Sequence, residues 1–151
     1  MRKLMVLLDD TRECLNAIRY AAMRASRTGG GVVVLSVIRP DEIQHGFGVA
    51  EVMRSEAKER IQAHFDVYAK WMRDRQGIDP ELVLREGDPA DQILAHLAED
   101  PEIGVIVLGM ASEKGAKNPV VTRLLRDVGT LPTPITLVPG DLDKDRLESI
   151  S

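Results

Sequence analysis

Two adjacent acidic residues, Asp9 and Asp10, directly follow an apolar run at positions 3–8 and are the first candidates for chemistry. A carboxylate at the end of a buried strand can bind a divalent cation or a hydroxyl group of a ligand. It can equally stabilise a turn or the first turn of a helix by accepting hydrogen bonds from backbone N–H groups. For Asp9, a ligand-binding role and a turn or capping role therefore both stay open.

The acidic pair alone does not predict a magnesium site of the kind found in phosphorylated receiver domains. Such a domain also needs an acceptor aspartate at the end of a central strand. The corresponding run at 103–108 ends in Gly109 and Met110, and no lysine directly follows the run at 135–138. We therefore favour a nucleotide pocket over a receiver-type metal site.

The remaining residues with chemical potential do not form a catalytic pattern. Cys14 lies on the apolar face of the first predicted helix, which favours a small core residue over a nucleophile. His45, His64 and His96 are widely spaced, and none has metal-ligand spacing with cysteine or with another histidine. Gly-x-Ser-x-Gly, Walker and dinucleotide-binding motifs are absent from the sequence. We expect no catalytic residue and no metal site.

Five short apolar runs alternate with helical patterns along the chain. The runs lack polar alternation, which is typical of strands buried on both faces. The expected strands are 3–8, 32–38, 81–85, 103–108 and 135–138, and the expected helices are 13–26, 49–75, a helix from position 89 onward, and 120–128.

Local signals place the ends of these helices. Asp10 resembles the capping residue of the first helix, and Asp88, followed by a proline, predicts the start of the third. Asn118 and Pro119 predict the start of the fourth helix, and a helix N-terminus is a potential anion site. Gly129 is expected to end that helix.

Strands joined by helices imply right-handed β-α-β crossovers. The expected fold is α/β, a Rossmann-like open parallel sheet of five strands with helices on both faces. Ligands of such sheets bind beyond the carboxyl ends of the strands. We expect Asp9, Val37 and Gly109, which lie at the ends of three runs, to converge on one cleft there, and the segment 39–49 to form a flap near it.

The order of these features resembles the universal stress protein family (UspA-like). The resemblance covers roughly 4–138, and its segments are MVLLDD, LNAIRYA, VVVLSVI, REGDPADQIL, VIVLGM and LPTPITLV. The resemblance implies the strand order 3-2-1-4-5. We expect one domain over 1–138, followed by a polar tail over 139–151 that is either a short helix or a loose arm.

In nucleotide-binding members of this family, a first-strand aspartate helps hold the adenosine moiety and backbone groups near the end of the second strand contact the adenine. A Gly-x-x-Gly-(nine residues)-Gly-Ser/Thr loop encloses the phosphates. The resemblance implies these roles for Asp9, Val37 and, as the first loop glycine, Gly109. Without gaps, the later loop positions fall on Ser112, Thr122 and Arg123, while Gly115 offers a replacement turn. Because glycine lets backbone N–H groups approach a phosphate, the missing glycines predict a chain without a working ATP loop.

The amino-acid composition limits the kinds of molecule that this chain is expected to bind. The 20 basic and 24 acidic residues give a net charge of −4, and aromatic residues make up only 3% of the chain. A mildly acidic chain with few aromatic side chains is not typical of a protein that binds nucleic acid or an anionic membrane. The single cysteine fits the reducing cytoplasm.

The expected function is that of a cytoplasmic universal stress protein that acts by binding and regulation, with no cofactor. The alternative is an ATP- or AMP-binding stress regulator with a remodelled phosphate loop and slow ATP hydrolysis. Family members commonly pair as homodimers. The run at 135–138 is the expected shared edge, because an unpaired apolar sheet edge favours association.

Overall fold

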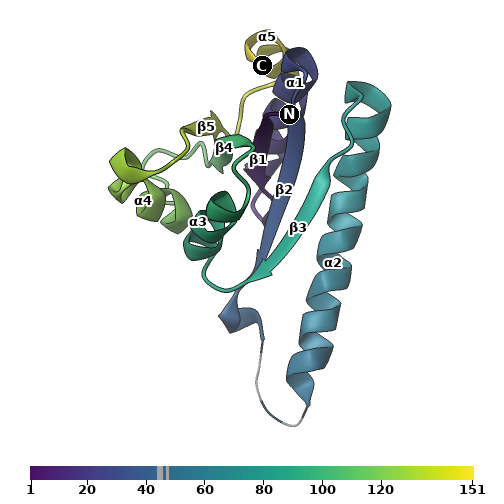
Figure 1. Cartoon of the computed structure of the whole chain (residues 1–151), viewed down its shortest axis with the longest axis vertical. Coiled ribbons are helices and arrows are strands. Elements are labelled where there is room, and N and C mark those ends of the chain that lie inside the picture. The colour runs from purple at the N-terminus through teal and green to yellow at the C-terminus, as the bar shows by residue number, and fades with distance from the viewer. Residues whose placement is uncertain (44–45, 47) are drawn as a thin grey trace.

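The fold is built on one five-stranded sheet in the computed structural model, which describes residues 1–43, 46 and 48–151 (Figure 1). The strands are β1 (Lys3–Leu7), β2 (Gly31–Ile38), β3 (Glu81–Glu86), β4 (Ile103–Met110) and β5 (Ile135–Pro139). All neighbouring strands pair in parallel, in the order β3-β2-β1-β4-β5. The predicted fold class and strand order are confirmed. His45 lies outside the described residues.

The central strand, β1, is buried on both faces of the sheet. Leu4 and Val6 pack into one apolar core, whereas Met5 and Leu7 pack into the other. Burial on both sides explains why this run carries no polar alternation.

Helices cover both faces of the sheet (Figure 1). They are α1 (Cys14–Thr28), α2 (Val49–Trp71), α3 (Pro89–Glu99), α4 (Pro119–Arg126) and α5 (Lys144–Ile150), with a π-helical turn (Met72–Gln76) continuing α2 and 3₁₀ turns at Pro40–Glu42 and Val128–Thr130. The α1 and α5 helices and the end of α2 pack into the core that contains Leu4, and α3 and α4 pack into the core that contains Met5. Within the described part of the chain, no helix combines the length and apolar character needed to cross a membrane.

The helix starts agree only in part with the predicted caps. Asp88 caps α3 as predicted, since its Oδ2 accepts the backbone N–H of Asp91 at 3.1 Å. The predicted cap by Asp10 is wrong, because no described side chain caps α1. The turn before α1 is instead held by Asp9, whose Oδ1 accepts the backbone N–H of Thr11 at 2.9 Å. The carboxylate that holds the turn therefore belongs to Asp9, one position before the predicted cap, Asp10.

The fourth helix starts and ends earlier than predicted. It begins at Pro119, which fits the first turn because proline lacks an N–H group that would be unpaired there. It ends at Arg126, and Gly129 lies in the 3₁₀ turn that follows. Gly129 therefore does not end the helix.

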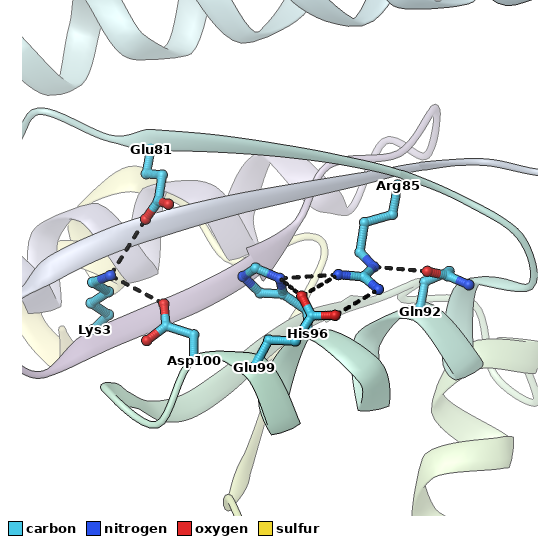
Figure 2. Close-up of polar contacts among 7 residues, drawn as sticks. All are labelled: Lys3, Glu81, Arg85, Gln92, His96, Glu99 and Asp100. Atoms are coloured by element: carbon cyan, nitrogen blue, oxygen red, sulfur yellow. Dashed lines mark hydrogen bonds and ion pairs between the residues drawn. The ribbon is translucent and has the colours of Figure 1, made fainter.

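Arg85 ties the edge strand β3 to α3 (Figure 2). Its Nε donates to Oε1 of Gln92 at 2.7 Å, and its Nη1 donates to Oε2 of Glu99 at 2.8 Å. The hydrogen bond from this guanidinium lowers the pKa of the Glu99 carboxyl. The same Nη1 lies 3.4 Å from Nδ1 of the buried His96. These contacts fix the position of α3 against the sheet.

A second charged cluster joins elements at the amino edge of the sheet. Lys3 Nζ lies 3.1 Å from Oδ2 of Asp100 and 3.5 Å from Oε2 of Glu81 (Figure 2). Its hydrogen bond with Asp100 raises the pKa of the Lys3 ammonium. The cluster links the start of β1 to β3 and to the residue that follows α3.

The segment after β5 folds back onto α1. Asn16 Nδ2 donates to the carbonyl oxygens of Pro139 and Leu142 at 3.2 and 3.0 Å. Arg27 Nη1 donates to the carbonyl oxygen of Ser151 at 2.7 Å, and Leu147 is completely buried. Of the two forms expected for this segment, the structure has the short helix, α5.

We predict that Leu147→Ala lowers the free energy of unfolding by about 2–5 kcal/mol, the usual cost of removing a buried leucine side chain. The control is Ile150→Ala on the same helix, where the side chain is 39% exposed, and we expect a change within about 0.5 kcal/mol. Denaturant unfolding of the full chain measures both values. Equal midpoints for the two variants would show that α5 does not dock in solution.

Candidate functional site

A cavity of about 470 Å³ lies at the carboxyl edge of the sheet. Its lining includes the residues that follow β1, the end of β2, one side of α2 and the starts of α3 and α4. Ligands of open parallel sheets bind at this edge, and the volume is in the usual range for a small-molecule site. The cavity is therefore the candidate site.

Asp9 is half-buried in the cavity lining, two residues after the end of β1. Its Oδ1 accepts hydrogen bonds from both the backbone N–H and the hydroxyl group of Thr11. These bonds fix the carboxylate as in an Asx turn. No described residue donates to Oδ2. Asp9 therefore stabilises the turn, and its Oδ2 remains an acceptor for a ligand.

Val37 also lines the cavity, and no hydrogen bond of its backbone N–H or C=O group is described outside the sheet ladder. In a strand, successive residues direct their backbone polar groups to alternate neighbours. Leu35 O accepts from Leu8 N on the β1 side, and Ile38 O accepts from Gly87 N on the β3 side. The N–H and C=O groups of Val37 therefore face the β1 side, where β1 has already ended.

Charged side chains of both signs line the rest of the cavity. The described part of the predicted flap contributes Arg39 and Glu42. Oε1 of Glu42 lies 3.3 Å from Nη2 of Arg60 on α2, which links the segment after β2 to that helix. His64, one turn further along α2, also lines the cavity and packs its ring against Tyr68, with 5.1 Å between the ring centroids.

The start of α4 does not offer the anion site expected from its sequence. Asn118 Oδ1 accepts the backbone N–H groups of Val120 and Val121 at 3.0 and 3.2 Å, and Pro119 has no N–H group. Because Asn118 already accepts these N–H groups, an anion bound at the start of α4 would be held by side chains. Lys117, an exposed residue, lines the cavity at this point.

Arg123 is the second cation that α4 and its preceding loop place in the cavity. Its Nη2 donates to Oδ1 of Asp91 at 2.6 Å, and its Nη1 lies 3.8 Å from Oδ2 of Asp88. The guanidinium is therefore held by the first turn of α3. Arg123 is the residue that falls at the Ser/Thr position when the family's phosphate loop is counted from Gly109 without gaps.

Gly109 does not join Asp9 and Val37 among the described residues that line the cavity. It lies in β4 against the start of α1, and a Cβ atom on it would lie 2.7 Å from the carbonyl carbon of Glu13. Gly140 meets the same residue, with 2.7 Å between its added Cβ and the Cβ of Glu13. In this chain, close packing accounts for glycine at position 109.

The other positions matched to the phosphate loop also lie outside the described cavity lining: Ser112, Gly115 and Thr122. Gly115 has a φ of +78° in a turn where Ala116 N donates to Glu113 O, and Thr122 N donates to Asn118 O within α4. The structure thus brings together Asp9 and Val37 and leaves the rest of the predicted set apart.

Cys14 is placed as a core residue. Its Sγ donates to the carbonyl oxygen of Asp9 at 3.4 Å, and burial raises the pKa of the thiol to about 11. A thiol protonated at neutral pH is a poor nucleophile. Among the described residues, no group of three or more His, Cys, Asp or Glu side chains is arranged to hold a metal ion.

The α2 wall of the cavity was missed by sequence reasoning. Arg60 and His64 lie far along the chain from Asp9, and a helix periodicity shows which face is apolar but not which sheet edge the polar flank meets. The only available signal was the length of the predicted helix, which exceeds that needed to cover the sheet.

Comparison with known proteins agrees with this arrangement of strands and helices. Residues 1–138 match the model of the universal stress protein family. No functionally curated protein matches the sequence.

Several solved structures share the fold. UspA from Lactobacillus plantarum is 18% identical, with a TM-score of 0.72 over 91% of this chain and 97% of that chain. A universal stress protein family member from Burkholderia pseudomallei is 20% identical, with a TM-score of 0.71 over 91% and 95%. The universal stress protein from Archaeoglobus fulgidus in complex with dAMP is 21% identical, with a TM-score of 0.59 over 91% and 98%. At these identities the likeness shows the fold.

We predict that Gly109→Ala lowers the free energy of unfolding by about 1–3 kcal/mol, because the added methyl group overlaps the α1 backbone. The matched control is Gly129→Ala, where an added Cβ meets no atom within 4 Å and we expect a change within about 0.5 kcal/mol. Denaturant unfolding compares them. A stable Gly109→Ala protein would contradict the packing role of this glycine.

Proposed function

We propose that this chain, which belongs to the universal stress protein family, is a cytoplasmic regulator that acts by binding a nucleotide in the cavity and lacks the family's ATP loop. The observation that carries the proposal is that Asp9 and Val37 line the same cavity. The Archaeoglobus fulgidus relative in complex with dAMP supports a nucleotide as the ligand class.

The two groups complement the two parts of a nucleoside. Oδ2 of Asp9 is an acceptor for a ribose hydroxyl group, and a charge-assisted hydrogen bond of this kind is stronger than a neutral one. The N–H and C=O groups of Val37 present a donor and an acceptor side by side, which suits the edge of a heteroaromatic base. A site of this kind binds its ligand without needing a nucleophile or an acid–base pair.

The charges of the cavity argue against ATP as the preferred ligand. Five carboxylates line it, from Asp9, Asp10, Glu13, Glu42 and Asp88, and the four cations Arg39, Arg60, Lys117 and Arg123 do not outnumber them. A triphosphate carries several negative charges and needs donors or a metal ion to offset this field. The alternative is a remodelled ATP-binding site with slow hydrolysis. The binding experiment distinguishes it from the proposed site.

We predict that calorimetry of the full chain shows AMP binding in the millimolar range or tighter, and weaker binding of ATP with Mg²⁺. Asp9→Asn should weaken AMP about tenfold or more, since it removes the charge from a ligand hydrogen bond. The control is Asp66→Asn on α2, an exposed carboxylate that accepts a hydrogen bond from Gln62. It should bind AMP as the parent protein does.

If the parent protein shows no binding heat with either nucleotide at millimolar concentration, nucleotide binding is refuted. Tighter binding of ATP than of AMP would favour the remodelled loop. Melting temperature provides an independent readout, because a ligand at 100 times its Kd stabilises by about 2.7 kcal/mol.

We also propose that the protein pairs as a homodimer through the β5 edge. β5 pairs only with β4 among the described strands, and its Leu137 is 38% exposed. An exposed apolar side chain on an unpaired edge strand favours association. Ile135, in contrast, is packed against the core that contains Met5, so a charge there would also disturb folding.

We predict that Leu137→Lys converts the dimer to a monomer in sizing chromatography combined with light scattering, because like charges would face each other across a two-fold contact. Ile150→Lys on α5, at 39% exposure, is the matched control and should stay dimeric. If the Leu137→Lys variant keeps the mass of the parent protein, the interface lies on another surface.

A further inference from the structure

We propose that Arg123, held in place by Asp91, is the phosphate-binding residue of the cavity and selects nucleotides that carry a single phosphate. The proposal rests on the nucleotide binding proposed above and names the ligand class. It assigns to one side chain a task that the family resemblance gives to a glycine-rich loop.

The guanidinium of Arg123 is hydrogen-bonded on one side only, although Asp88 forms an ion pair on its other side. Nη2 donates to Oδ1 of Asp91 at 2.6 Å, and Asp91 is not among the described residues that line the cavity, whereas Arg123 is. Nη1 lies 3.8 Å from Oδ2 of Asp88, which is too long for a hydrogen bond. Among the described contacts, the N–H groups of Nε and Nη1 therefore stay available.

An oriented guanidinium suits a phosphate. Its N–H groups form a planar fork that matches two phosphate oxygens, and holding one nitrogen on a carboxylate reduces the freedom lost on binding. Asp91 is thus a positioning residue. The side chain of Arg123 is 38% exposed, so a ligand can reach it.

Other donors at this end of the cavity are few. The Asn118 cap occupies the N–H groups of Val120 and Val121, and Pro119 has none. Lys117 is the second exposed cation, on the loop before α4. A phosphate here therefore meets side-chain cations and not a backbone cradle.

The same geometry disfavours further phosphates. Gly109 is packed against Glu13, and residues 111–116, which follow β4, lie outside the described lining. Beside Arg123 stands the Asp88 carboxylate, which also caps α3 and so is fixed in position. A phosphate bound to the guanidinium therefore lies beside one fixed carboxylate, and each further phosphate adds repulsion from that carboxylate.

The experiment compares adenosine, AMP and ATP with Mg²⁺ by calorimetry on the full chain. For Arg123→Thr we expect AMP binding to weaken about tenfold or more, the usual effect of losing a charge-assisted hydrogen bond, with adenosine binding unchanged. Arg123→Lys should keep part of the AMP affinity. Asp91→Asn should weaken AMP less than Arg123→Thr does, again without affecting adenosine.

The matched control is Arg126→Thr, three residues further along α4, which is paired with Asp127 at 3.6 Å and lies outside the described lining. It should leave all three affinities unchanged. Thermal unfolding of each variant confirms that the chain is folded under the conditions of the titration.

The outcomes separate the two proposals. If the parent protein binds none of the three ligands, nucleotide binding itself fails. If the parent binds AMP and Arg123→Thr binds it equally well, only the role of Arg123 is refuted. Equal weakening of adenosine and AMP in Arg123→Thr would show a structural tie between α3 and α4, which also overturns the phosphate role.

Discussion

The early end of the central strand is the constraint on which the rest of the structure depends. β1 stops at Leu7, paired with Leu35, while β2 continues to Ile38 and β4 to Met110. A parallel strand that ends before both neighbours leaves their backbone groups unpaired on one side. That gap creates the open edge of Val37 and allows Asp9 to turn into the cavity. The chemistry of the site follows from this difference in length.

Sequence patterns predicted the sheet because the physics of its strands is local. A run buried on both faces must be apolar at every position, and such runs are visible without any knowledge of their neighbours. The cap by Asp88 was predictable for the same reason, since it depends on the next three residues. Asp10 was a wrong choice of cap, although Glu13 follows it at the spacing of a capping box, because α1 begins only at Cys14 with Glu13 itself in the cap position.

The unpredicted parts of the site depend on contacts between distant segments. Arg60 and His64 reach the cavity from α2, and Arg123 is held by a residue 32 positions earlier in the chain. Gly109 matched a ligand-binding motif, yet its surroundings require glycine because the backbone of Glu13 lies against it. A motif glycine has two possible physical causes, and a sequence alone does not separate them.

The two outer strands of the sheet have opposite characters. β3 carries Glu81 and Glu86 at its ends, and ion pairs tie Glu86 to Arg54 and Arg85 to Glu99. Charged side chains on an outer strand oppose the addition of another strand. β5, with Leu137, has no such protection. Under the proposed contact through β5, two copies joined there would form a closed unit and not a growing filament, because β3 opposes further extension of the sheet.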